Sequence, residues 1–139
     1  MRFLFLTSAV LLALGATACQ QADISPAGAT SLVGEWHWVS SQGGLTGTQT
    51  YTPASTGTEQ KWVFQADSTY QVYTTRQGST QLTGSGSFSV KLAPSIFTGQ
   101  PARALFLSGQ QPQILGELSR TRLSLADNYP DGFGHTYER

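Results

Sequence analysis

The chain has 139 residues, with eight Lys and Arg against eight Asp and Glu and a formal net charge of zero. This length accommodates a single domain. The charged residues are scattered along the chain without a basic block, so we expect no nucleic acid among its partners.

The first 18 residues have the pattern of a secretory signal peptide. Arg2 supplies a positive charge, an apolar run follows, and Ala16 and Ala18 form the small-residue pattern that precedes a cleavage site. The apolar run is shorter than the about 20 residues that a permanent helical anchor needs. We therefore expect residues 1–18 to be removed.

Cys19 is the only cysteine of the chain and directly follows this leader. The stretch GATAC, residues 15–19, resembles the bacterial lipobox, whose cysteine receives a diacylglycerol and is then acylated at its new N-terminus. Several acyl chains would anchor the protein stably to a membrane, since each buried methylene contributes about 0.8 kcal/mol. The alternative is an ordinary signal peptide that leaves a free cysteine or one paired with another chain.

The resemblance implies a lipid-anchored protein of the bacterial cell envelope. Gln20 stands where an aspartate often retains such lipoproteins in the inner membrane, which favours the outer membrane, with the protein facing the periplasm or the cell surface. Residues 19–31 are small and polar and predict a flexible tether. Residues 32–139 are long enough to form one domain around one core.

Periodicity predicts about eight strands in this domain. Alternation in residues 32–40 places five residues on one face, which we expect to point inward: Leu32, Gly34, Trp36, Trp38 and Ser40. Similar patterns follow in chain order at residues 62–64, 70–74, 84–92, 103–109, 114–119, 122–127 and 133–139.

The connections between these strands are short, except at residues 41–58 and 93–102. No helix is expected after the leader. Sequential strands joined by hairpins and apolar on one face favour an up-and-down barrel or a sandwich. Closure into a barrel would remove exposed strand edges.

Several short motifs resemble those of compact bacterial lipocalin-like domains in their order and spacing. They are GEW at 34–36, GG at 43–44 with Gly47, WVF at 62–64 followed by ADSTY, ILGELSRTRLSLAD at 114–127, and DG at 131–132 before the closing YER. The resemblance covers essentially the whole mature domain and implies an all-β, up-and-down antiparallel barrel of about eight strands. The chain is shorter than a typical lipocalin and has no obvious helix after its last strand.

The same resemblance assigns Trp36 and Arg139 as a pair that closes one end of the barrel. A guanidinium over an indole face contributes about 0.5 to 2 kcal/mol. The alternative is a C-terminal arginine that extends into solvent.

The interior decides between two functions, because eight strands enclose a space that side chains fill or that holds one small ligand. A lipid-anchored carrier or sensor would bind a small, partly apolar molecule there, and inward Gly84, Gly86 and Gly116 would leave it room. The alternative is an envelope interaction module with a filled barrel and an unknown protein partner. The exposed patch of this module would involve Val39, Val63 and Tyr73. Under either function, six inward aromatic residues line the cavity or form the core: Trp38, Trp62, Phe64, Tyr70, Phe88 and Tyr137.

Residues 41–58 contain glycines and hydroxyl side chains, and they form either a gate over the ligand or a solvent loop. Catalysis has little support, because no nucleophile motif, paired carboxylates or phosphate loop is present. His37 is expected on the outer face, and an inward His135 would touch a ligand or be a core histidine. We expect no catalytic residues, no metal and no cofactor, since an enzyme would need a titratable cluster that the linear sequence does not show.

Overall fold

The computed structural model describes residues 31–139. The predicted signal peptide, Cys19 and the tether up to residue 30 lie outside the described residues. The elements are β1 (Gly34–Gly43), β2 (Gln49–Tyr51), α1 (Pro53–Thr56), β3 (Thr58–Phe64), β4 (Thr69–Arg76), β5 (Ser79–Pro94), β6 (Pro101–Leu107), β7 (Gln113–Leu118), β8 (Arg122–Asp127) and β9 (Phe133–Glu138).

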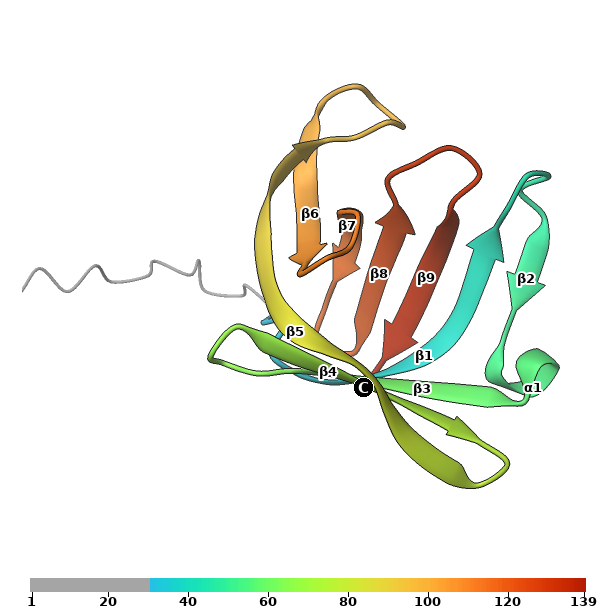
Figure 1. The fold of residues 1–139 in the computed structure, drawn as a ribbon. Helices are drawn as coiled ribbons and strands as arrows, with labels where there is room; N and C mark the ends of the chain where they lie inside the picture. The colour runs from blue at the N-terminus through green and yellow to red at the C-terminus, as the bar shows by residue number, and fades with distance from the viewer. Residues whose placement is uncertain (1–30) are drawn as a thin grey trace, which may run out of the picture.

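The strands form one antiparallel sheet that closes on itself. Their order is β2-β1-β3-β4-β5-β6-β7-β8-β9, and β1 also pairs with β9. Apart from β2, neighbours in the sheet are neighbours in the chain, so the predicted up-and-down barrel of eight strands is confirmed (Figure 1). Within residues 31–139, no helix combines the length and the apolar character needed to cross a bilayer.

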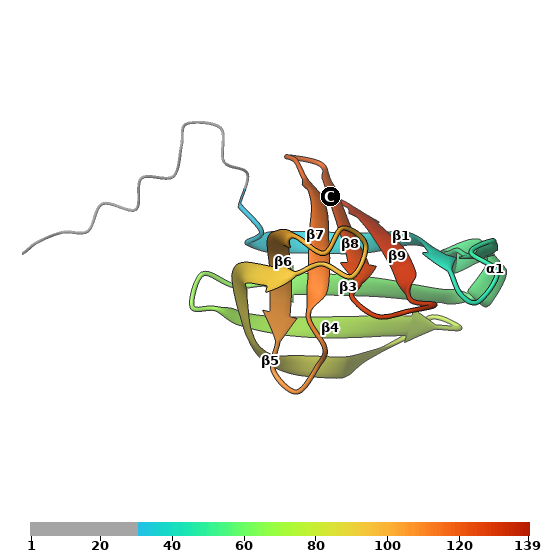
Figure 2. The same ribbon diagram turned by 90° about the horizontal axis from the view of Figure 1, so that it is seen from above.

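The predicted loop at residues 41–58 contains regular structure, contrary to expectation. β1 continues to Gly43, β2 pairs with the end of β1, and α1 adds one helical turn. The Thr52 side chain caps this turn, and Gly57 ends it at φ 63°, a left-handed conformation that glycine adopts without strain. The turn lies at the opposite end of the molecule from the start of β1 (Figure 2).

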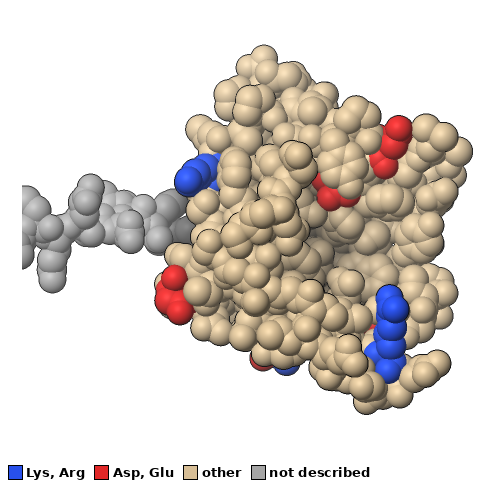
Figure 3. All heavy atoms as spheres, in the orientation of Figure 1, with Lys and Arg blue, Asp and Glu red and all other residues tan. Residues whose placement is uncertain are grey.

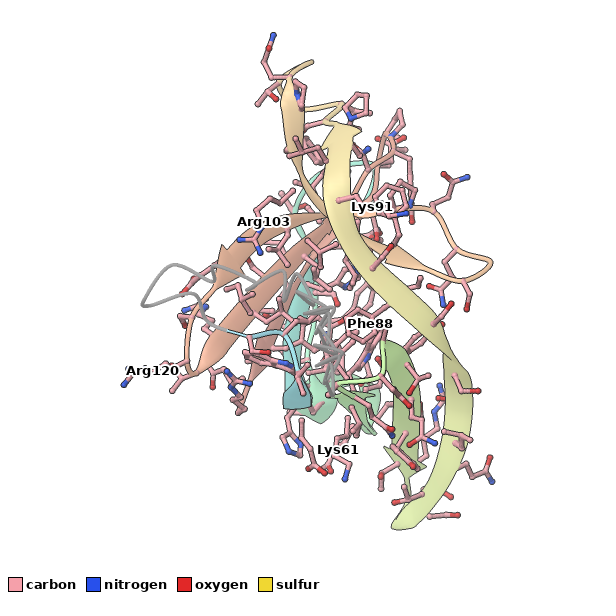
Figure 4. All side chains as sticks on the ribbon, turned by 90° about the vertical axis from the view of Figure 1, so that its left-hand side faces the viewer. Lys61, Phe88, Lys91, Arg103 and Arg120 are labelled. Atoms are coloured by element: carbon pink, nitrogen blue, oxygen red, sulfur yellow. The ribbon has the colours of Figure 1, made fainter. Side chains whose placement is uncertain are left out.

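Apolar side chains fill the inside of the barrel. Trp36 is fully buried, and the aromatic and aliphatic residues of the other strands pack around it. The labelled Phe88 lies near the middle of the molecule, whereas Lys61 and Arg120 lie at its periphery (Figure 4). The buried residues of this core are Leu32, Trp36, Phe64, Tyr70, Val72, Leu105, Leu107, Leu115, Leu123, Leu125 and Tyr137.

A bulge in β1 changes which serine faces inward. Trp38 is paired with Tyr137 and Ser40 with Thr136, so Val39 is an extra residue on β1. Such an insertion reverses the alternation beyond it. The prediction that Ser40 shares the inward face of Trp38 is therefore wrong, and Ser41 lies on that face instead.

Two of the three glycines, Gly86 and Gly116, do not open a space in the barrel wall as expected. Gly116 is exposed on the outer face, because its inward neighbour is the buried Leu115. Gly86 does face inward, but a Cβ placed on it would lie 3.2 Å from the ring of Tyr70 and within overlap distance of Ser108. Neighbouring side chains therefore occupy the volume next to Gly86.

Candidate functional site

At one end of the barrel, Arg139 lies over Trp36. The centre of the guanidinium is 4.2 Å from the centre of the indole ring. The indole Nε1–H donates a 2.8 Å hydrogen bond to the carbonyl of Leu32. Arg139 also donates to the carbonyls of Val33 and Arg120, so one side chain joins the segment before β1 to the β7–β8 turn.

The other end of the barrel lies where β1 ends and β3 begins. β1 pairs with β3 only as far as His37 and Lys61, and beyond this point it pairs with β2. The two strands then diverge, with β2 and α1 between them (Figure 1). We call this the open end, and the space-filling view shows a hollow there, with acidic atoms above it and basic atoms below it (Figure 3).

Trp38 and Trp62 lie between the open end and the buried core. Both pack against the buried core and are only half-buried themselves. Trp62 lies 5.7 Å, centre to centre, from the ring of Tyr137 and is stacked on Tyr70 at 6.0 Å. These contacts leave part of two indole surfaces at the base of the open end, where an apolar molecule could pack against them.

A chain of hydrogen bonds crosses the inner wall beside Trp38. The Trp38 Nε1–H donates to Ser41 Oγ at 2.9 Å, Ser41 Oγ lies 2.8 Å from His135 Nδ1, and His135 Nε2 lies 3.2 Å from Asp127 Oδ1. A carboxylate only accepts, so we assign the Nε2 proton to the bond with Asp127. Neutral His135 then accepts the Ser41 hydroxyl proton at Nδ1, and every bond in the chain is satisfied.

Asp127 is the most connected residue of this network. Besides His135, the Gln113 amide donates to it at 2.9 Å, and the Tyr129 hydroxyl and the Phe133 backbone N–H each donate at 3.0 Å. Four donors satisfy both carboxylate oxygens, and they come from β7, β9 and the turn after β8. The carboxylate therefore fixes the geometry of the open end and retains little capacity to bind anything else.

These contacts also set the acid–base properties of Asp127 and two neighbouring tyrosines. Burial opposes ionisation of Asp127, but the hydrogen bonds from Gln113, Phe133 and Tyr129 hold its pKa below the usual value, and a protonated His135 would lower it further. The bond to Asp127, then burial and the carboxylate charge, raise the pKa of Tyr129. Burial above all, and then the charge of Asp127, raise the pKa of Tyr137.

A serine, a histidine and a carboxylate in hydrogen-bonded series are the groups that activate a nucleophile in many hydrolases. Here Ser41 is only 8% exposed, and its oxygen already accepts the Trp38 N–H. A nucleophile needs an accessible oxygen, so we interpret the series as a network that positions the wall. The expectation that the protein is not an enzyme stays a prediction.

Sequence reasoning missed Ser41 and Asp127, and it left the direction of His135 open. His135 points inward, and its bonds to both residues cross between strands. The bulge at Val39 hid Ser41, because strict alternation assigned the inward position to Ser40. In the sequence, only the positions of Asp127 and His135 on either side of a hairpin turn indicated that two members of this network could meet.

The structure brings the six predicted interior aromatics into one cluster. Phe64, Tyr70 and Tyr137 are buried, and Trp38, Trp62 and Phe88 are half-buried and pack against them. His37 is exposed on the outer face. Within the described part of the chain, no group of three or more His, Cys, Asp or Glu side chains could hold a metal ion.

A second hollow, of about 450 Å³, lies on the outer wall of β7, β8, β9 and β1. Its lining is mostly small side chains and glycines, such as Ser124, Ala126 and Gly134. No charged side chain lines it, and the aromatic surface found at the open end is absent from its lining. We therefore assign the candidate site to the open end.

Comparisons with protein-family models, with curated proteins and with solved structures found no match to this chain. The resemblance to lipocalin-like domains accordingly rests on the sequence motifs and on the barrel topology.

Proposed function

We propose that this chain is a lipid-anchored lipoprotein of the bacterial envelope and that its barrel binds a small, partly apolar ligand at the open end.

 The observation that carries this proposal is the half-buried pair of indoles, Trp38 and Trp62, at the base of a polar wall. Within residues 31–139, Trp62 Nε1 and Gln113 Oε1 are buried without a hydrogen-bond partner. Buried polar atoms are normally paired, so a ligand that entered far enough to contact these two atoms could supply the missing acceptor and donor.

The filled-barrel interaction module remains the second candidate, and the β5–β6 hairpin favours it. Leu92 and Phe97 are 70% and 61% exposed, and Ile96 lies between them in the chain. The patch expected from the sequence is less exposed, since Val63 and Tyr73 are half-buried on the outer wall. An interaction through the hairpin would need no cavity.

Native mass spectrometry of residues 20–139, secreted into the periplasm of a bacterial host and purified without detergent, tests ligand binding. We expect a reproducible extra mass on the unmodified domain. Trp62→Phe removes the unpaired N–H and keeps an aromatic ring, so we expect this variant to lose most of the extra mass. Tyr73→Phe changes one polar group on the outer wall and serves as the matched control.

The outcomes separate the two candidates. An extra mass that Trp62→Phe retains in full would place the ligand elsewhere and contradict the proposed site. A clean mass from several hosts would favour the interaction module.

Replacing Cys19 with alanine tests the anchor. We expect the unmodified chain in the membrane fraction and the Cys19→Ala chain in the soluble periplasmic fraction, because the acyl chains supply the membrane affinity. Immunoblots of the two fractions measure the distribution. A variant that stays with the membrane would contradict lipidation at this residue.

A further inference from the structure

A polar pocket of about 410 Å³ lies on the inner wall of the open end, on β3, β4 and β5. The strand registers give its layout as rows across the three strands. The core row of Trp62, Val72 and Gly84 is followed toward the open end by Gln60, Thr74 and Gln81, and then by Thr58, Arg76 and Ser79. The pocket therefore begins where the aromatic core ends.

The lining of this pocket consists of hydrogen-bonding groups and one charge. Amide and hydroxyl side chains surround Arg76, and no carboxylate is among the lining residues, which are Gln60, Thr74, Arg76, Ser79, Gln81 and Thr83. Three ion pairs occur within residues 31–139, and Arg76 takes part in none of them. The positive charge of the pocket is therefore not neutralised by the described part of the chain.

The guanidinium of Arg76 is held in a defined orientation. Its Nε–H donates a 3.0 Å hydrogen bond to Thr58 Oγ1, and Thr58 is only 8% exposed. This bond uses one side of the guanidinium. The two terminal nitrogens, which bind carboxylates and phosphates in a fork, have no recorded partner among residues 31–139.

The wall beside Arg76 is also organised in advance. The Thr83 hydroxyl donates to the carbonyl of Val72 at 3.3 Å, and Thr83 Oγ1 accepts from Thr74 at 2.7 Å. Both bonds lie at the irregularity between β4 and β5. A pocket whose groups are already ordered loses less entropy when a ligand binds.

The geometry points to an oxyanion, a carboxylate or a phosphate, as the group that this pocket binds. The inference deepens the proposed function and rests on it in one respect: the anion is the polar head of the ligand whose apolar part packs against Trp62. A cationic head would be repelled by Arg76. A neutral head would leave the guanidinium without a partner of opposite charge.

Calorimetric titrations of the secreted full chain carrying Cys19→Ala test this inference. The probes are octanoate, octyl phosphate, octanol and inorganic phosphate. We expect both octyl anions to bind at least about tenfold more tightly than octanol, because only they form charge-assisted bonds with the guanidinium.

Variants of single arginines identify the residue responsible. Arg76→Gln is expected to lower the affinity for both octyl anions to that for octanol and to leave the affinity for octanol unchanged. Arg76→Lys keeps the charge but loses the fork, so an intermediate loss is expected. Arg120→Gln makes the same change of charge at the periphery, and we expect it to alter no affinity more than about twofold.

The possible failures distinguish the two proposals. Octanol binding as tightly as octanoate, or octanoate binding equally well to Arg76→Gln, would overturn the anion inference while the ligand site stands. Inorganic phosphate binding through Arg76 with no gain from the octyl chain would support the anion site and contradict an apolar ligand. Binding of none of the probes would overturn the anion inference.

Discussion

Trp36→Ala is expected to lower the free energy of unfolding by about 3 to 5 kcal/mol, which is the usual cost of removing a large aromatic side chain from a core. Trp36 is fully buried, and its indole holds the Leu32 carbonyl and lies under the guanidinium of Arg139. The substitution removes all three contributions at the end of the barrel where the described residues 31–139 begin and end.

Urea denaturation followed by circular dichroism measures this loss. Phe97→Ala is the matched control, because it removes an aromatic ring that is 61% exposed, and we expect a change within about 0.5 kcal/mol. An unchanged unfolding midpoint for Trp36→Ala would refute its role in closing the barrel.

Asp127→Asn is expected to lower the free energy of unfolding at neutral pH by about 2 to 4 kcal/mol. The carboxylate accepts four hydrogen bonds. An asparagine amide directs its own N–H groups toward some of these donors, so buried donors lose their acceptor. Asp131→Asn changes the same chemical group at an exposed position in the following turn and serves as the control.

The effect of Asp127→Asn should depend on pH in a defined direction. The pKa of Asp127 in the folded state lies below the ordinary aspartate value of 3.8, so folding favours the ionised carboxylate. The contribution of the ionised carboxylate to the free energy of unfolding is complete at pH values well above 3.8. This contribution is lost as the pH falls through the folded-state pKa. Unfolding curves from neutral pH to pH below 3.8 should therefore show the two proteins converging in acid, and a constant difference would contradict this role.

The local pattern of the chain predicted most of the fold. Alternation of polar and apolar residues depends only on neighbours in the sequence. The inward orientation of the Trp62, Phe64 and Tyr70 side chains could therefore be predicted from the sequence. The short connections between these patterns indicated hairpins for the same reason. The pairing of Trp36 with Arg139 came from the resemblance to lipocalin-like domains, and no local pattern contained it.

The candidate site depended on features that local patterns do not contain. The bulge at Val39 is defined by the pairing of β1 with β9, and it turned Ser41 toward His135, 94 residues away in the sequence. The orientation of Arg76 likewise depends on Thr58 across the β3–β4 ladder.

The sequence by itself determined an all-β chain with aromatic inward faces, because side-chain alternation and turn chemistry are properties of short segments. Only the tertiary structure decided that β1 and β9 close the barrel, that Ser41, His135 and Asp127 meet, and that Arg76 lies in a pocket without a carboxylate. The physical reason is that register, bulges and closure are set by hydrogen bonds between strands distant in sequence, and a shift of one residue reverses every side chain beyond it.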